Sequence, residues 1–159
     1  MAHLLNVCWL EIHGKIESRM LSPKTNYAAY LIFKLDEASR GLSAPVQEAS
    51  VSVGGHESKH IVRVQPEDAE RPRVPAVYRR FFRRMVNFVS SEESVSALSS
   101  AETRLPTSRA DGWMEVEMGE FFNENGEDGE VDLCLMEVKG GHWKSGLTVL
   151  GIEVRPKKK

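Results

Sequence analysis

The sequence predicts an all-β fold, an antiparallel β-sandwich with jelly-roll-like topology. Three observations predict it: apolar and polar residues alternate with a period of two in several short segments, glycine and proline separate these segments, and little of the chain has helical periodicity. Such alternation is typical of antiparallel sheets with one buried face. The 159 residues are enough to bury a core, so residues 1–159 are expected to form a single domain.

The first strand is expected at WLEIHGKI, near the N-terminus. Even-numbered residues from Cys8 to Ile12 point one way and odd-numbered residues from Trp9 to His13 point the other, the pattern of a half-buried strand. Gly14 is expected to end this strand. Further strands are expected over residues 27–35, 49–53, 60–64, 113–118, 131–138 and 147–156.

Residues 66–110 are the least regular part of the chain and are interpreted as an insertion. After Pro75 the apolar spacing fits a short amphipathic helix, but the RRFFRRMVNFV part also fits a strand, and both interpretations stay open. At the C-terminus, residues 155–159 are expected to form a basic, solvated tail.

The composition is that of an ordinary soluble protein, with a formal net charge of −2 that selects neither nucleic acid nor membrane. The N-terminus lacks the features of a signal peptide, and no run of about 18 apolar residues occurs, so we expect a cytoplasmic protein without membrane insertion. Cys8 and Cys134 lie in apolar segments and are expected to be buried free thiols, able to cross-link chains only in an oxidising compartment.

No metal or catalytic motif is recognisable. The acidic loop at 123–130 does not match an EF-hand, because Asp128 stands where the calcium loop requires glycine. An irregular calcium loop is one alternative; a solvated turn in which Gly126 and Gly129 take positive φ is the preferred interpretation. Nucleophile-elbow, zinc-protease, phosphate-loop and dinucleotide motifs are missing from the sequence, so no enzymatic activity is expected.

Glu130 and Glu137 do not fit a pair of glycosidase carboxylates. Seven residues of extended chain span roughly 23 Å, whereas such pairs lie about 5–9.5 Å apart. Their opposite parity also places them on opposite faces of a strand unless a bulge intervenes. His56 and His60 precede a strand rather than lie on a helix, so they are expected to be surface histidines and not a metal-binding pair.

The segment GGHWKSG is the strongest binding motif. Flanking glycines permit a tight loop in which Trp143 presents an apolar ring beside donors from His142 and Lys144. A pyranose, with apolar C–H patches and polar edges, suits such a surface. The alternative is that Trp143 is a core residue, as is expected more strongly for Trp9 and Trp113.

Several blocks, in this order, resemble the phloem protein 2, or Nictaba-like, lectin family of plants: WLEIHGKI, LSPKTNYAAYLIFKL, RADGWMEVEMGEFFN, GEDGEVDLCLMEVKGGHWKSG and GIEVRP. The short form of the chain looks most like the phloem-sap lectins of cucurbits such as cucumber. The resemblance covers nearly the whole chain apart from residues 40–105.

The resemblance implies a β-sandwich lectin that is usually a homodimer and lacks a signal peptide, found in cytoplasm, phloem sap or nucleus. It implies binding of chitooligosaccharides, the oligomers of N-acetylglucosamine, and of N-glycans, with no metal or other cofactor. Family positions matching Glu130, Glu137, Trp143 and Lys144 are associated with the sugar site. Tryptophans that precede the WLEI block in the family have no counterpart, which leaves the aromatic platform to Trp143, Trp113, Phe122 or a partner subunit.

Two other functions are open. Six arginines between Arg71 and Arg84, interleaved with Tyr78, Phe81 and Phe82, are a combination that binds RNA, although a solvated basic edge around packed rings explains them as well. A ubiquitin-ligase adaptor is the other, because members of the family carry an F-box ahead of this domain. No F-box is expected in the few residues before Trp9.

Overall fold

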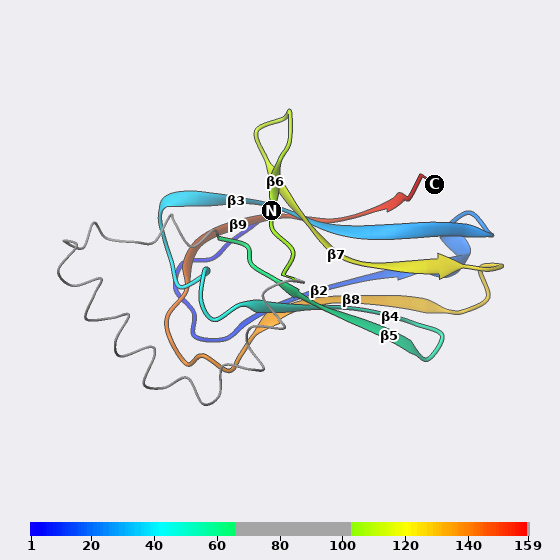
Figure 1. The fold of residues 1–159 in the computed structure, drawn as a ribbon, viewed down its shortest axis with the longest axis horizontal. Coiled ribbons are helices and arrows are strands. Elements are labelled where there is room, and N and C mark those ends of the chain that lie inside the picture. Colours follow the sequence, from blue (N-terminus) through cyan, green and yellow to red (C-terminus); the bar gives the residue numbers. More distant parts are fainter. Residues whose placement is uncertain (66–102, 159) are drawn as a thin grey trace.

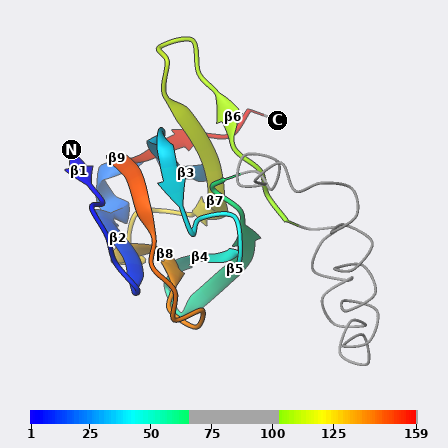
Figure 2. The ribbon, with the colours of Figure 1, turned by 90° about the vertical axis from the view of Figure 1, so that its left-hand side faces the viewer.

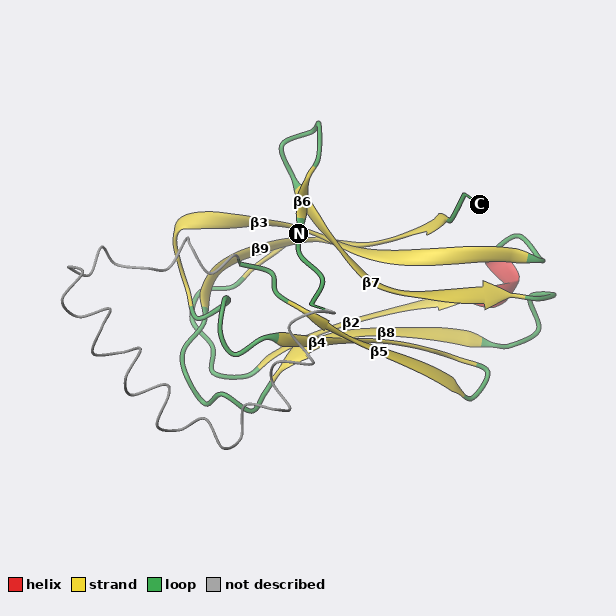
Figure 3. Cartoon of the chain, viewed as in Figure 1, coloured by secondary structure: helices red, strands yellow, loops and turns green. Residues whose placement is uncertain are grey.

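The computed structural model describes residues 1–65 and 103–158 and confirms the predicted all-β fold (Figure 1). Two antiparallel sheets pack face to face, and a 3-10 turn, η1 (Ser18–Met20), is the one helical element among the described residues (Figure 3). The helix or strand expected after Pro75 lies outside the described residues, as does the arginine-rich stretch.

Each sheet combines strands that are distant in the sequence. The five-stranded sheet has the order β1 (Ala2–His3), β9 (Ser145–Pro156), β3 (Thr25–Arg40), β7 (Met114–Asn123) and β6 (Thr107–Ser108). The four-stranded sheet has the order β2 (Leu10–Glu17), β8 (Glu130–Glu137), β4 (Gln47–Val53) and β5 (His56–Val62). Figure 2 shows the two layers from the end of the sandwich.

The strands form nested antiparallel pairs, with β4 pairing β5, β3 pairing β7, β2 pairing β8 and β1 pairing β9. A chain that is rolled up in this way alternates between the two sheets and forms a jelly roll. The predicted topology is therefore confirmed, with the short β6 added at the edge of the five-stranded sheet.

The core lies between the sheets and is built from alternate residues of each strand, as the period of two predicts. Its fully or nearly fully buried members include Leu31, Phe33, Val116 and Met118 from one sheet and Val51, Val131, Leu133 and Leu135 from the other. Burying one such side chain contributes about 1.5–3 kcal/mol. The predicted free thiols are present without a disulfide, Cys134 buried and Cys8 half-buried.

The first strand differs from its prediction at both ends. Gly14 does not end it, and β2 continues to Glu17. A Cβ atom at Gly14 would come within 2.7 Å of the Ile152 Cδ1 atom in the opposite sheet, so glycine permits close approach of the sheets here. Trp9, expected in the core, is instead 62% exposed just before the strand.

The acidic loop between β7 and β8 adopts the predicted turn. Gly126 and Gly129 have φ values of 80° and 82°, which L-residues with side chains rarely adopt. Asn123 is buried at the start of the loop, and its side-chain amide donates hydrogen bonds of 3.0–3.2 Å to three backbone carbonyls around η1. In the described part of the chain, no helix is long and apolar enough to cross a membrane.

Candidate functional site

The loop between β8 and β9 lies at one end of the sandwich, where the chain crosses from one sheet to the other (orange in Figures 1 and 2). It contains the GGHWKSG segment. Lys144, the last residue before β9, forms an antiparallel bridge with Val7, with N–O distances of 2.7 and 2.9 Å. The bridge ties this loop to the segment that leads into β2.

A buried ion pair between Lys144 and Glu137 lies beneath the loop. Lys144 is 0% exposed and Glu137 is 4% exposed, and the ammonium contacts the carboxylate Oε2 atom. The same ammonium donates hydrogen bonds to the carbonyl oxygens of Cys8 at 2.8 Å and His142 at 3.2 Å. The Glu137 Oε1 atom accepts hydrogen bonds from two backbone N–H groups of the following turn, at 2.7 and 3.1 Å.

These contacts determine the protonation of Glu137. Burial by itself raises the pKa of a carboxyl group, but the hydrogen bonds and charge of Lys144 and the backbone N–H donors outweigh it, so the pKa of Glu137 is lower than its usual value. Glu137 is therefore ionised at neutral pH. The two side chains contact each other and backbone groups of the loop and of Cys8, so the ion pair supports the loop from beneath.

Trp143 is not a core residue, since it is 62% exposed, the same fraction as Trp9. Trp143 directly precedes Lys144, and Trp9 follows Val7 by two residues, so both tryptophans lie next to the bridge between Val7 and Lys144. Their Cα atoms therefore lie within about 17 Å of each other. The Trp9 Nε1 atom donates a 2.8 Å hydrogen bond to the Glu11 Oε2 atom, which fixes one edge of the indole.

Trp9 is not among the site residues that the sequence predicts. The alternation of apolar and polar residues places Trp9 on the same face as Glu11 and His13, but it also predicts that Trp9 lies within the strand. The sequence carries no signal for its exposure, because only the structure shows that β2 begins at Leu10 and leaves Trp9 outside the strand.

His142 connects the loop to the β3–β4 connection. Its Nε2 atom lies 3.1 Å from the carbonyl oxygen of Gly41. Gly41 has a φ of 74°, and a Cβ atom there would collide with the backbone carbonyl oxygen of Trp143. The close approach of these two backbone segments therefore requires glycine at position 41.

Glu130 and Phe122 lie at the opposite end of the sandwich (Figure 1). The register of β2 with β8 is unbroken from Glu17–Glu130 to Leu10–Glu137, so no bulge intervenes and the two glutamates lie on opposite faces, as their spacing predicts. Glu130 is exposed and forms a 2.9 Å ion pair with Lys15.

Trp113 also lies away from the loop. It is half-buried, and it precedes β7 in the hairpin that projects from the sandwich in Figure 1. The Lys34 ammonium lies 4.4 Å from the centre of its ring. Of the predicted site residues, the structure brings together Glu137, His142, Trp143 and Lys144 and separates them from Glu130, Trp113 and Phe122.

The chain matches the family described as phloem protein 2 over residues 1–156. Similar curated proteins of Arabidopsis thaliana include the putative F-box protein PP2-B2, 39% identical over 98% of this chain and 42% of that protein. F-box protein VBF is 39% identical over 98% of this chain and 54% of its own length, and F-box protein PP2-B15 is 40% identical over 97% and 52%. The chain thus spans about half the length of the curated relatives it matches. With a family match over nearly all its residues, the chain belongs to the phloem protein 2 family.

Proposed function

We propose that this domain is a non-catalytic lectin that binds N-acetylglucosamine oligomers at a surface formed by Trp9, His142 and Trp143, hereafter the tryptophan surface. The observation that carries the proposal is the exposure of two tryptophans, each 62%, beside a loop that a buried ion pair holds in place. An exposed indole on a fixed backbone presents an apolar face at little conformational cost.

Saccharide chemistry suits this surface. The apolar C–H face of a pyranose stacks on an indole, and its hydroxyl and acetamido groups require oriented donors and acceptors, which the His142 ring and the loop backbone supply. Glu137 and Lys144 act by positioning the loop. Two ring platforms on separate segments favour an oligomer over a single sugar, because successive sugar units can occupy both.

The test is calorimetric titration with chitotriose. Trp143→Ala and Trp9→Ala are each expected to lose ~1–3 kcal/mol of binding free energy, the range for removal of a stacking or hot-spot aromatic residue. Phe122→Ala is the matched control, because Phe122 is 49% exposed but lies at the other end of the sandwich. Unchanged affinity in both tryptophan variants would refute the assignment of this surface.

Dimerisation is part of the proposal. Two tryptophan surfaces in one particle would bind a multivalent glycan with higher avidity than one. Sedimentation velocity at micromolar concentration is expected to give a dimer of the 17.9 kDa chain, and glycoprotein agglutination is expected to require it. A monomer in sedimentation that still agglutinates would contradict this step.

Two other functions stay predictions. RNA binding rests on the arginine-rich stretch outside the described residues, and filter binding across a salt series tests it, because phosphate-driven affinity falls steeply with salt. Adaptor function is suggested by the relatives named as F-box proteins. Precipitation of glycoproteins with this domain, with and without chitotriose as competitor, would test whether it serves as the recognition part of such a protein.

A further inference from the structure

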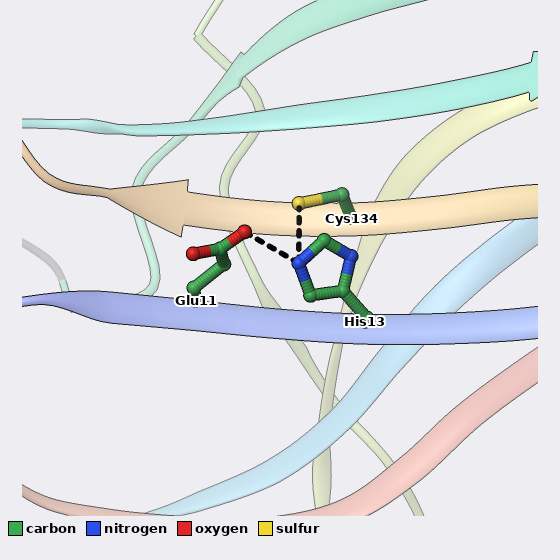
Figure 4. Close-up of side chains that lie close together, drawn as sticks. All are labelled: Glu11, His13 and Cys134. Carbon is green, nitrogen blue, oxygen red and sulfur yellow. Dashed lines mark hydrogen bonds and ion pairs between the residues drawn. The ribbon is translucent and has the colours of Figure 1, made fainter.

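Three different metal-ligating side chains meet on the outer face of the four-stranded sheet (Figure 4). Glu11 and His13 are alternate residues of β2, and Cys134 of β8 is the direct cross-strand partner of His13. The His13 Nε2 atom lies 2.5 Å from Glu11 Oε1 and 4.0 Å from Cys134 Sγ. All three donor atoms lie within 4.8 Å of one another.

The register of the strands explains this arrangement. Residues two apart on a strand point to the same face, and directly opposite residues on a neighbouring strand have Cβ atoms about 4.5–5.5 Å apart. The three side chains therefore form a triangle carried by paired strands rather than by a loop. Donors on regular strands are held more precisely than donors on loops.

The electrostatic environment favours a cation. Two carboxylates, those of Glu11 and Glu48, act electrostatically on the Cys134 sulfur, and both contribute a negative potential there. The nearby ammonium of Lys15 is directed away, toward Glu130 at 2.9 Å and Asp132 at 3.5 Å.

We propose that Glu11, His13 and Cys134 bind one transition-metal ion, with Zn²⁺ the preferred ion. Imidazole nitrogen, thiolate sulfur and carboxylate oxygen are the donors that Zn²⁺ takes, at about 2.0–2.3 Å, whereas Ca²⁺ and Mg²⁺ require oxygen ligands. Three protein ligands leave the fourth tetrahedral position to water. The thiol releases its proton when the metal binds, so the charge of the site is balanced by a thiolate and a carboxylate.

The consequence for the protein is a cross-link between β2 and β8 on the outside of the sheet. A ligand that binds only the folded state raises its stability in proportion to the logarithm of its concentration. The proposal is independent of sugar binding, although Glu11 also holds the Trp9 indole through its other oxygen atom.

The test uses the chelator-treated chain titrated with ZnCl₂ alone. One equivalent of Zn²⁺ per chain is expected, with an increase in the thermal midpoint. Cys134→Ser and His13→Ala are each expected to weaken binding at least tenfold. His13 is largely exposed and serine is nearly isosteric with cysteine, so both variants should fold, and circular dichroism checks this.

Cobalt identifies the sulfur ligand. A thiolate-to-cobalt charge-transfer absorption is expected in the original chain and in Cys8→Ser, the matched control, and is expected to vanish in Cys134→Ser. His56→Ala, which removes an exposed histidine on β5, should leave Zn²⁺ binding unchanged. Absence of Zn²⁺ uptake, or a cobalt band that depends on Cys8 instead of Cys134, would overturn the proposal.

Discussion

Replacement of Lys144 by methionine removes the ammonium from the buried ion pair while keeping an unbranched side chain of similar length. Glu137 is only 4% exposed, so water cannot solvate the carboxylate that remains. Breaking a buried pair by removing one partner typically lowers the free energy of unfolding by about 3–5 kcal/mol. The carbonyl oxygens of Cys8 and His142 also lose their shared donor. We therefore expect a loss near the upper part of that range.

Urea unfolding at pH 7, followed by circular dichroism, measures this loss. For a domain of this size, 1 kcal/mol corresponds to roughly 2–4 °C in Tm, so a loss of about 5 kcal/mol lowers Tm by roughly 10–20 °C. Lys15→Met is the matched control, because its ion pair with Glu130 is exposed, with Lys15 61% accessible. Exposed pairs contribute about 0–1 kcal/mol.

A double variant separates the charge from the packing. Glu137→Gln retains an acceptor for the two backbone N–H groups but carries no charge, so the combination with Lys144→Met should recover part of the lost stability. The reasoning is refuted if Lys144→Met alone loses less than about 1 kcal/mol, or if the double variant is less stable than the sum of the two single changes predicts.

Three further outcomes follow from the geometry. The pKa of Glu137 is lower in the folded state, so its contribution to stability is complete at neutral pH and is lost as the pH falls below about 4.5 toward the folded-state value; acid unfolding should be less steep in Glu137→Gln. Gly41→Ala should lower both stability and chitotriose affinity by more than Gly112→Ala, because both positions have positive φ but a Cβ atom collides with Trp143 only at Gly41. Asn123→Ala leaves three carbonyls without their donor and should lower the free energy of unfolding in urea by about 1–3 kcal/mol.

The strands were predictable because their signal is local. In β8, Val131, Leu133 and Leu135 are buried toward the core, as the period of two predicts, although Cys134 on the other face is buried as well. The same period of two also places Glu130 and Glu137 on opposite faces, which was predictable from the sequence. The end of β2 was not predictable from the sequence. Glycine commonly ends strands, and Ile152, the residue against which Gly14 packs, is distant in the sequence.

The candidate site was predictable only in part. GGHWKSG identified the loop in which the exposed Trp143 lies, since flanking glycines and a tryptophan are visible in the sequence. The burial of Lys144 was not predictable from the sequence, because lysine is almost always a surface residue and its neighbours Trp143 and Ser145 give no sign of burial. The exposure of Trp9 was not predicted either, because an aromatic residue at the start of an alternating segment is usually buried.

By itself, the sequence determined which residues share a strand face, and hence the all-β class and the two-layered core. Membership of the phloem protein 2 family comes from the sequence match over residues 1–156. Only the tertiary structure decided which side chains are covered at the end of the sandwich. That depends on the bridge between Val7 and Lys144, which joins segments at opposite ends of the chain. Alternation is a property of neighbouring residues, whereas exposure depends on contacts made by segments far apart in the sequence.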